Sequence, residues 1–403
     1  MTGPTHPSPQ PLALGGSALG GSVLEESALE GLALEGPAIE GERGVVAMSG
    51  GVDSSVTAAL LVEQGFDVVA VSMRLYESAP KSDRSCCSPD DLFDARSVAA
   101  RLDVPFYVAN YVEAFRERVI DYFVDEYRRG RTPNPCVACN NHLKFDVLLG
   151  RTRALGGAWL ATGHFARIER EGERYRLLRG VDKAKDQSYF LCGLPRPLLG
   201  RIRFPLGGMT KEEVRQLAER FGLHNAQKAE SQEICFVTGG SYADFVRERL
   251  DRADLIPGNL VLEDGTVLGT HTGIHQFTIG QRRGLGVAWS APLFVQSVNP
   301  DTGDVVLSSR EGLETIGLEA DRCNWLRWAD RPPGPFEAAA QLRYRAPATP
   351  CLVTPLGDGD RVRVDFESPQ HGVAPGQFAV FYEGEEVLGG GTINATLRGG
   401  GRA

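Results

Sequence analysis

The cysteines are the side chains of this sequence best suited to nucleophilic chemistry, and they stand at positions 86, 87, 136, 139, 192, 235, 323 and 351. In a 403-residue chain without a secretory signal, they do not indicate a disulfide framework. Cys136 and Cys139 form a C-x-x-C pair in residues 132–140, which we predict to be a rigid, proline-containing loop before a helix that begins near Leu143. A thiol near a helix N-terminus is more often a thiolate at neutral pH.

A third thiol, Cys235, leaves three interpretations of this chemistry open. A C-x-x-C pair is commonly half of a zinc site, but the sequence has no second pair with matching spacing. Cys136, Cys139 and Cys235 could together hold an iron–sulfur cluster. Alternatively, two of them could pass sulfur through a persulfide and a disulfide. The thiols that we interpret as buried and structural are Cys192, Cys323 and Cys351.

A second chemical feature is the segment 49–55, Ser-Gly-Gly-Val-Asp-Ser-Ser, which lies between a short apolar run and a helical stretch. Gly50 and Gly51 let the backbone turn so that successive N–H groups face inward, and three serines add hydroxyl groups. The segment lacks the Gly-Lys-Ser/Thr ending of a Walker A motif, and its glycines are not spaced as in a dinucleotide fingerprint. It therefore predicts a polyphosphate-binding loop of another kind, at the N-terminus of a helix.

Alternating strands and helices predict a parallel sheet, covered on both faces, that positions this loop. The expected strands are 45–48, 67–73, 106–109 and 159–162, and the expected helices are 90–102, 112–129 and 143–155. After about residue 240, short alternating runs are separated by turn pairs such as Asp264-Gly265, which is typical of small β-barrels. The predicted fold is an α/β domain followed by a small β-rich central domain and a C-terminal β-barrel.

We expect four segments, with boundaries at 1–43, 44–239, 240–318 and 319–398. The first is a low-complexity repeat that we expect to be a disordered extension, and it carries one arginine and six glutamates. It therefore supplies five of the nine net negative charges of the chain.

The charge pattern and the hydropathy bear on partners and location. Arginines cluster at 128–131, 151–153, 282–283 and 343–345, where a locally basic surface would suit nucleic acid, although solvated surface charge explains any single cluster better. No apolar run approaches the roughly 20 residues that span a bilayer, and no signal or transit peptide is evident. We expect a cytoplasmic protein with no membrane partner.

Six motifs in one order resemble the tRNA-uridine 2-sulfurtransferase family (MnmA), whose catalytic domain is a PP-loop domain of the N-type ATP pyrophosphatases. The motifs occupy residues 49–55, 132–140, 161–164, 185–191, 234–236 and 273–284. The resemblance extends from about Gly44 to Thr392. It implies a PP-loop, adenine nucleotide alpha hydrolase-like fold for the α/β domain.

The resemblance also implies a role for each matching residue. Cys139 would be the nucleophile, and Cys235 would carry persulfide sulfur and form a transient disulfide with Cys139. Asp53 would help to hold Mg²⁺. The implied ATP site consists of Ala47, Met48, Ser49, Gly50, Gly51, Val52, Asp53, Ser54, Met73 and Gly163. The implied tRNA contacts are Asn134, Pro135, Cys136, Lys185, Asp186, Gln187, Arg343 and Tyr344.

The reaction that the family implies is 2-thiolation of a wobble uridine, in which the C2 oxygen is adenylated and then replaced by persulfide sulfur. Its cofactor would be ATP with Mg²⁺, and its partners would be tRNA and a sulfur donor, either a cysteine desulfurase or a sulfur-relay carrier. Cys136 departs from the family, because many members carry aspartate there as a candidate general acid/base. A thiol can still exchange a proton, but its reference pKa is several units above that of a carboxyl group, so the acid/base assignment stays open. Cys136 is therefore a candidate either for proton exchange or for a cluster ligand.

Two other function classes remain open from the residues. A different PP-loop synthetase that adenylates a small molecule would need neither Cys139 nor Cys235. A non-catalytic RNA-binding module would retain the loop without using ATP. Thiolation through an iron–sulfur cluster on Cys136, Cys139 and Cys235 is a variant of the first hypothesis.

Overall fold

The computed structural model describes residues 42–76, 89–228, 234–237, 240–357 and 360–399. The predicted disordered extension lies outside these ranges, apart from its last two residues, and Cys86 and Cys87 also lie outside them. Within the described ranges, no helix is both long and apolar enough to cross a membrane.

The first half of the described chain builds a five-stranded sheet in the order β3-β2-β1-β4-β7, with all neighbouring pairs parallel. Its strands are β1 (Arg43–Ala47), β2 (Asp67–Arg74), β3 (Phe106–Asn110), β4 (Trp159–Ala161) and β7 (Ile202–Arg203). β1 is central, and its Val45 pairs with Val69 on one side and Leu160 on the other. The predicted parallel sheet is confirmed.

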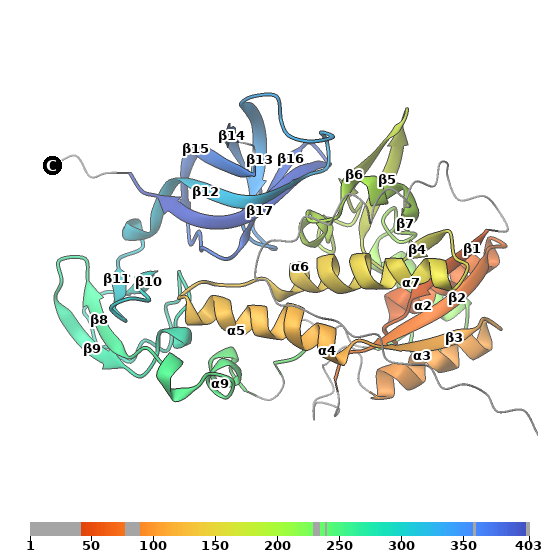
Figure 1. Cartoon of the computed structure of the whole chain (residues 1–403), viewed down its shortest axis with the longest axis horizontal. Coiled ribbons are helices and arrows are strands. Elements are labelled where there is room, and N and C mark those ends of the chain that lie inside the picture. The colour runs from red at the N-terminus through yellow and green to blue at the C-terminus, as the bar shows by residue number, and fades with distance from the viewer. Residues whose placement is uncertain (1–41, 77–88, 229–233, 238–239, 358–359, 400–403) are drawn as a thin grey trace, which may run out of the picture. The chain divides into compact units, whose positions relative to one another are not determined.

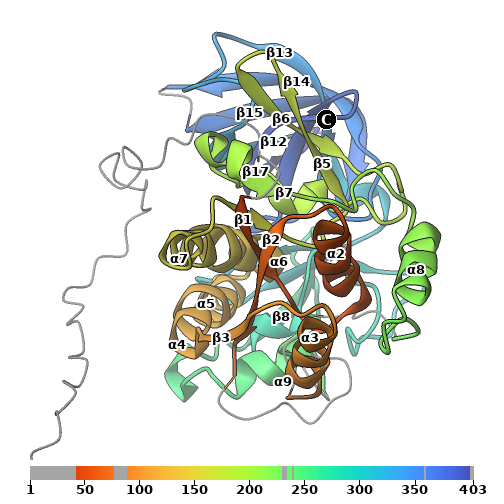
Figure 2. The ribbon, with the colours of Figure 1, turned by 90° about the vertical axis from the view of Figure 1, so that its right-hand side faces the viewer.

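Helices cover both faces of this sheet. Figure 2 shows α2, α3 and α8 on one side, and α4, α5 and α7 on the other. The helices are α2 (Val52–Glu63), α3 (Pro89–Arg101), α4 (Val112–Phe115), α5 (Asp121–Arg128), α6 (Pro135–Cys139), α7 (Leu149–Ala154) and α8 (Lys211–Arg220). π-Helical stretches at Arg116–Ile120 and Asn140–Leu148 join α4 to α5 and α6 to α7, so that Figure 1 shows two long, adjacent helices.

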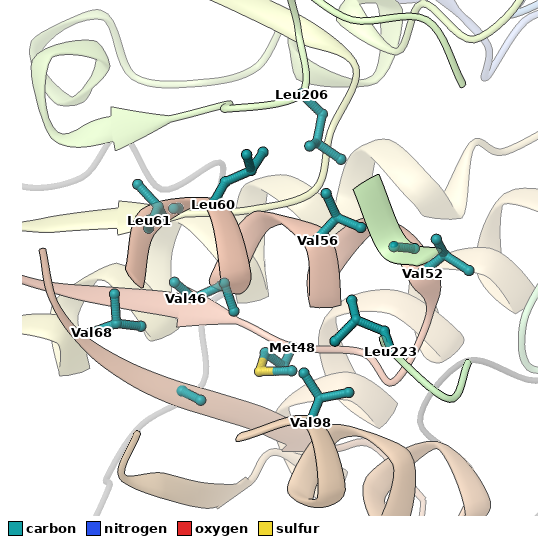
Figure 3. Packing of buried hydrophobic residues seen from close by; sticks show 14 of the residues in the cluster. Val46, Met48, Val52, Val56, Leu60, Leu61, Val68, Val98, Leu206 and Leu223 are labelled. Carbon is teal, nitrogen blue, oxygen red and sulfur yellow. The ribbon is translucent and has the colours of Figure 1, made fainter. Parts of the chain in front are cut away.

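The core between α2 and the sheet fixes the loop that joins them. Val46 of β1 and Met48, just after β1, pack with Val56 and Leu60 of α2, and Leu206 packs on the cluster from another segment (Figure 3). All five side chains are at most 6% exposed. Full burial of such a side chain contributes about 1.5–3 kcal/mol, so the two ends of the loop are held firmly.

One predicted boundary is wrong. The helix that we expected from Leu143 begins at Pro135, so the C-x-x-C pair lies in its first turns and not in a preceding loop. Asn134 is the N-cap, because its Oδ1 accepts a hydrogen bond from the Val137 N–H at 3.3 Å. Proline is well suited to the first helical position, since its fixed φ is already helical and its missing N–H needs no partner.

The second half of the described chain is β-rich, as predicted. After the short helix α9 (Tyr242–Arg247), a four-stranded sheet has the order β10-β11-β8-β9. Its strands are β8 (Gly258–Leu262), β9 (Val267–His271), β10 (Phe294–Val298) and β11 (Val305–Ser308).

The C-terminal strands form a closed antiparallel barrel, because β12 pairs with β17 as well as with β15. The barrel order is β12-β15-β14-β13-β16-β17. Its strands are β12 (Glu314–Trp325), β13 (Phe336–Gln341), β14 (Thr349–Leu356), β15 (Arg361–His371), β16 (Phe378–Glu383) and β17 (Glu386–Leu397). The predicted C-terminal barrel is confirmed.

A hairpin that we did not predict extends the barrel sheet. β5 (Ala166–Glu171) and β6 (Arg174–Arg179) follow the parallel strand β4, yet Leu178 pairs with Glu386 of β17. The buried Glu386 carboxylate contacts the guanidinium groups of Arg174 at 2.7 Å and Arg327 at 2.8 Å. The hairpin therefore connects the α/β half of the chain to the barrel.

Candidate active site

The phosphate loop folds back on itself between β1 and α2. Gly50 has a φ of +76°, which favours glycine, and a Cβ there would lie 2.1 Å from the Asp91 carbonyl oxygen. The Ser54 hydroxyl accepts from the Ser49 N–H at 3.2 Å and donates to the Gly51 carbonyl at 3.1 Å. Because the first N–H groups of a helix have no intrahelical acceptor, the start of α2 presents donors to this loop.

The back of the loop is braced by a segment that sequence reasoning missed. Asn225 is buried and donates to the Gly50 carbonyl at 3.0 Å. Lys228 contacts Asp91 at 2.7 Å and Asp94 at 2.5 Å. Burial disfavours the charge on Lys228, but the hydrogen bonds to these carboxylates outweigh burial and raise its pKa. Lys228 Nζ also lies 3.5 Å from the Gly50 carbonyl oxygen, so the loop is held by a buried amide and a cation.

A second lysine lies in front of the loop. Lys211 Nζ contacts Asp53 Oδ1 at 2.6 Å, and its side chain is 11% exposed. Lys211 is the first residue of α8, where Thr210 and Glu213 form a capping box. Its N–H also donates to Asp182 at 3.0 Å. The capping box was the local sequence signal for this helix start, but nothing in the sequence indicated that Lys211 would meet Asp53.

Three further predicted ATP-site residues border the loop or its sheet. Gly163 follows β4, and a Cβ there would lie 2.8 Å from the Asp53 carbonyl carbon and 2.9 Å from the Ser54 nitrogen. Met48 and Met73 are buried, Met48 just after β1 and Met73 within β2. The implied ATP-site residues are thus gathered at the carboxyl ends of β1, β2 and β4, where ligands of open α/β sheets bind.

The adjacent histidine is neutral. His164 is 8% exposed, and its Nδ1 lies 2.6 Å from the Thr162 hydroxyl. Burial, together with the nearby Lys144 charge, lowers the pKa of His164 well below its ordinary value. The imidazole therefore contributes a hydrogen bond and no charge at neutral pH.

The two thiols of the C-x-x-C pair differ in accessibility. Cys136 is exposed, whereas Cys139, one turn later, is partly buried. The segment before the helix is fixed by the barrel, because Gln377 Nε2 donates to the carbonyls of Thr132 and Pro133 at 3.0 Å each. The helix that carries both thiols therefore has a fixed start.

The third thiol lies at the edge of the sheet. Cys235 is partly buried, and the hydroxyl of Tyr76 donates a hydrogen bond to its Sγ at 3.4 Å. Tyr76 follows β2 by two residues, on the same edge as the phosphate loop that follows β1. Tyr76 is a contact of Cys235 that the sequence did not indicate. Within the described ranges, no three His, Cys, Asp or Glu side chains are grouped so that they could hold a metal ion.

Two of the predicted tRNA contacts have inward-facing side chains. Asp186 is 8% exposed in its side chain and accepts hydrogen bonds from Arg179 at 2.8 Å and from the Ser188 N–H at 3.0 Å. Gln187 Oε1 accepts from the Phe165 N–H at 3.0 Å. These two residues shape their loop, whereas the neighbouring Lys185 is partly exposed.

The structure brings the loop at 185–187 next to the turn at Arg343 and Tyr344. Arg179, which contacts the loop, also donates to Gln341 at 3.0 Å, and Gln341 donates to the Tyr344 carbonyl at 2.6 Å. The Tyr344 ring lies 4.3 Å from the Phe190 ring, centroid to centroid. Arg343 is exposed. Two stretches that are separate in sequence therefore share one surface.

The other cysteines and one arginine cluster have internal roles. Cys192 and Cys351 are buried, and burial raises the pKa of each thiol to about 12. Cys323 is partly buried, and burial raises its pKa as well. In the cluster at 128–131, Arg128 pairs with Asp125 and Asp254, so this cluster contributes ion pairs within the chain.

Family models match three successive parts of the chain. The tRNA methyl transferase HUP domain matches residues 42–239, the tRNA methyl transferase PRC-barrel domain matches 243–309, and the aminomethyltransferase beta-barrel domain matches 316–393. The tRNA-specific 2-thiouridylase MnmA of Geobacter metallireducens is 51% identical over 89% of this chain and 98% of the relative. The chain belongs to the MnmA family.

Other MnmA relatives agree with this assignment. The enzyme of the same name from Carboxydothermus hydrogenoformans is 49% identical over 88% of this chain and 98% of the relative. Among solved structures the likeness is weaker. A 4-thiouridine synthetase in complex with RNA and ATP has a TM-score of 0.33 and 16% identity over 52% of this chain and 50% of that chain.

Proposed function

We propose that this chain catalyses the ATP-dependent 2-thiolation of a uridine in tRNA, because its MnmA relatives are tRNA-specific 2-thiouridylases and its phosphate loop suits ATP. The observation that carries the proposal is the contact between Tyr76 and Cys235. It sets a candidate sulfur-carrying thiol at the end of β2, beside the strand that leads into the phosphate loop. Activation by ATP and delivery of sulfur could then occur at one edge of the sheet.

Activation is needed because the C2 oxygen of uracil is a poor leaving group. Attack of this oxygen on the α-phosphate of ATP breaks the bond to pyrophosphate, which the loop retains, and makes the oxygen part of AMP, a good leaving group. The loop is packed tightly enough to hold its N–H groups in place for this task, since a Cβ at Gly50 or Gly163 would collide with neighbouring backbone atoms. Asp53 would hold Mg²⁺, which neutralises phosphate charge when bound. Lys211 would then turn its charge from Asp53 towards the phosphates.

Sulfur transfer would use the two partly buried thiols. The Cys139 thiolate attacks the Sγ of the Cys235 persulfide, the Cys139–Cys235 disulfide forms, and hydrosulfide leaves. Hydrosulfide adds to C2 of the adenylated uridine, and AMP departs with the former C2 oxygen. A thiol reductant then returns both cysteines to thiols. A sulfur-donor protein, either a cysteine desulfurase or a relay carrier, would reload Cys235.

Binding of tRNA would use the shared surface of Lys185, Arg343 and Tyr344. Asp186 and Gln187 would act by holding that loop in shape, because their side chains are engaged inside it. The target base would leave the anticodon stack to reach the segment at Asn134, at a cost of a few kcal/mol.

The test is thiolation by single-cysteine variants. The purified chain is incubated with tRNA, ATP, Mg²⁺ and a persulfide donor, and the nucleosides are analysed for 2-thiouridine. Cys139→Ser and Cys235→Ser should each abolish 2-thiouridine while tRNA binding persists. Cys323→Ser, which removes a thiol of the barrel, serves as the matched control. Near-normal 2-thiouridine from either Cys139→Ser or Cys235→Ser would refute the relay.

A further inference from the structure

We infer that Tyr76 is a further catalytic residue, whose hydroxyl activates the Sγ atom of Cys235 as nucleophile and as leaving group. The inference deepens the proposed function, on which its purpose rests. It starts from the 3.4 Å hydrogen bond between the Tyr76 hydroxyl and Cys235 Sγ. An O–H donor at this distance stabilises a thiolate more than a thiol, because the bond to the charged acceptor is stronger.

The hydroxyl is aimed by packing on both sides. The Tyr76 ring meets the buried Phe115 ring edge to face at 5.4 Å, and Phe115 meets Phe236 in the same manner at 5.8 Å. Phe236 is the residue after Cys235, and it also contacts Phe123 at 5.1 Å. The donor and the sulfur are therefore attached to one set of interlocked rings, which keeps their separation fixed.

The Sγ atom of Cys235 carries negative charge at two steps of the proposed cycle. When Cys235 is loaded, its thiolate attacks the outer sulfur of a donor persulfide, the donor S–S bond breaks, and the donor cysteine leaves as a thiolate. When the Cys139–Cys235 disulfide is reduced, an incoming thiolate attacks Cys139 and Cys235 leaves as a thiolate. A hydroxyl that donates to Sγ lowers the cost of negative charge in both steps.

The expected effect has two opposing parts. Loss of a hydrogen bond to a thiolate should move the pH midpoint of Cys235 reactivity up by about one unit, which removes about nine-tenths of the thiolate at pH 7. Each remaining thiolate becomes about threefold more nucleophilic, since nucleophilicity rises with basicity with a Brønsted slope of about 0.4–0.5. With the reference thiol pKa of about 8.5 for the wild type, the net result is about threefold slower reaction at pH 7 and about 1.5-fold faster reaction at pH 9.5.

The rate of Cys235 modification plotted against pH should therefore give two curves, wild type and variant, that cross between pH 7 and 9.5. Tyr76→Phe removes one hydroxyl and keeps the ring. The full-length wild-type and variant proteins are treated with a dipyridyl disulfide between pH 6 and 9.5, quenched, and mapped by peptide mass spectrometry. Cys139 in the same molecule is the internal reference and should react at an unchanged rate in both proteins.

Tyr242→Phe is the matched control. The Tyr242 hydroxyl contacts Thr278 at 3.0 Å, and its ring stacks on Tyr127, which joins the same aromatic cluster through Phe123. The control should give no crossing. The inference is overturned if the Tyr76→Phe profile coincides with wild type, if its rates change by one factor at every pH, or if Tyr242→Phe produces the same crossing.

The thiol measurement needs neither ATP nor tRNA, so it fails or succeeds independently of the proposed function. Absence of 2-thiouridine from the wild-type assay would refute the proposed function, but it would not affect the pH profiles of Cys235 reactivity. If the wild-type and Tyr76→Phe profiles coincide while 2-thiouridine forms normally, only the role of Tyr76 is refuted.

Discussion

Substitution of Gly163 by alanine tests whether the phosphate loop depends on close backbone contact with the end of β4. The added Cβ would lie 2.8 Å from the Asp53 carbonyl carbon and 2.9 Å from the Ser54 nitrogen. Ordinary contact begins at 3.4 Å, so the start of α2 must move by about 0.6 Å. Overpacking of this kind costs about 1–3 kcal/mol of stability.

The same displacement should weaken ATP binding. The N–H groups at the start of α2 are the donors proposed for the phosphates, and a shift of about 0.6 Å takes a hydrogen bond from its best length to its limit. Loss of one charge-assisted bond is worth about 1.5–3 kcal/mol, so the KM for ATP should rise about tenfold to a hundredfold. The assay is tRNA-dependent pyrophosphate release across ATP concentrations, with the thermal midpoint measured in parallel.

Gly150→Ala is the control for this experiment. Gly150 lies in α7, and a Cβ there meets nothing within 4 Å. Alanine at an exposed helical position should stabilise the protein by about 0.5–1 kcal/mol and leave the KM for ATP unchanged. A wild-type KM in Gly163→Ala would show that the loop does not bind ATP through the donors at the start of α2.

Three other substitutions address neighbouring features. Asp53→Ala should abolish pyrophosphate release, whereas Lys211→Met should chiefly raise the KM for ATP, both measured across Mg²⁺ concentrations. Asn134→Ala removes the cap before the thiol-bearing helix and should lower the free energy of unfolding by about 1 kcal/mol in urea titrations, with Asn134→Asp as the capping control. Burial opposes ionisation of Asp94, but hydrogen bonds from Lys228 and a neighbouring histidine outweigh burial and lower its pKa. Its contribution to stability is therefore complete above about pH 4 and is lost below, a dependence that Asp94→Asn should flatten.

The parts of the fold that local pattern determines were predictable. β1 and β2 are apolar runs with one helix, α2, between them, and a parallel sheet with the phosphate loop at its carboxyl edge follows from that alternation. The helix start at Pro135 was not predicted, because Asn-Pro is equally typical of a turn and of a capped helix. Only the hydrogen bond from Val137 to Asn134 distinguishes the two.

The contacts of the site were less accessible to sequence reasoning because they join distant segments. Lys211 meets Asp53 across 158 positions, and Tyr76 meets Cys235 across 159. No spacing rule relates such residues, since the sheet order decides which loops become neighbours. Asp186 shows the opposite error. The motif implied that its side chain contacts tRNA, but its carboxylate is buried and pairs with Arg179 within the protein.

The hairpin β5–β6 has a consequence for synthesis of the chain. Leu178 pairs with Glu386, so one edge of β6 lacks its partner strand until roughly 200 further residues have been synthesised. At about 5–20 residues per second, the delay is roughly 10–40 s, in which a bare strand edge could pair with another nascent chain. β6 reads Arg-Tyr-Arg-Leu-Leu-Arg, whereas its partner β5 carries two arginines and two glutamates. The positive charge of the β6 arginines, of which Arg174 and Arg176 later contact Glu386, would keep nascent chains on neighbouring ribosomes apart until β17 is synthesised.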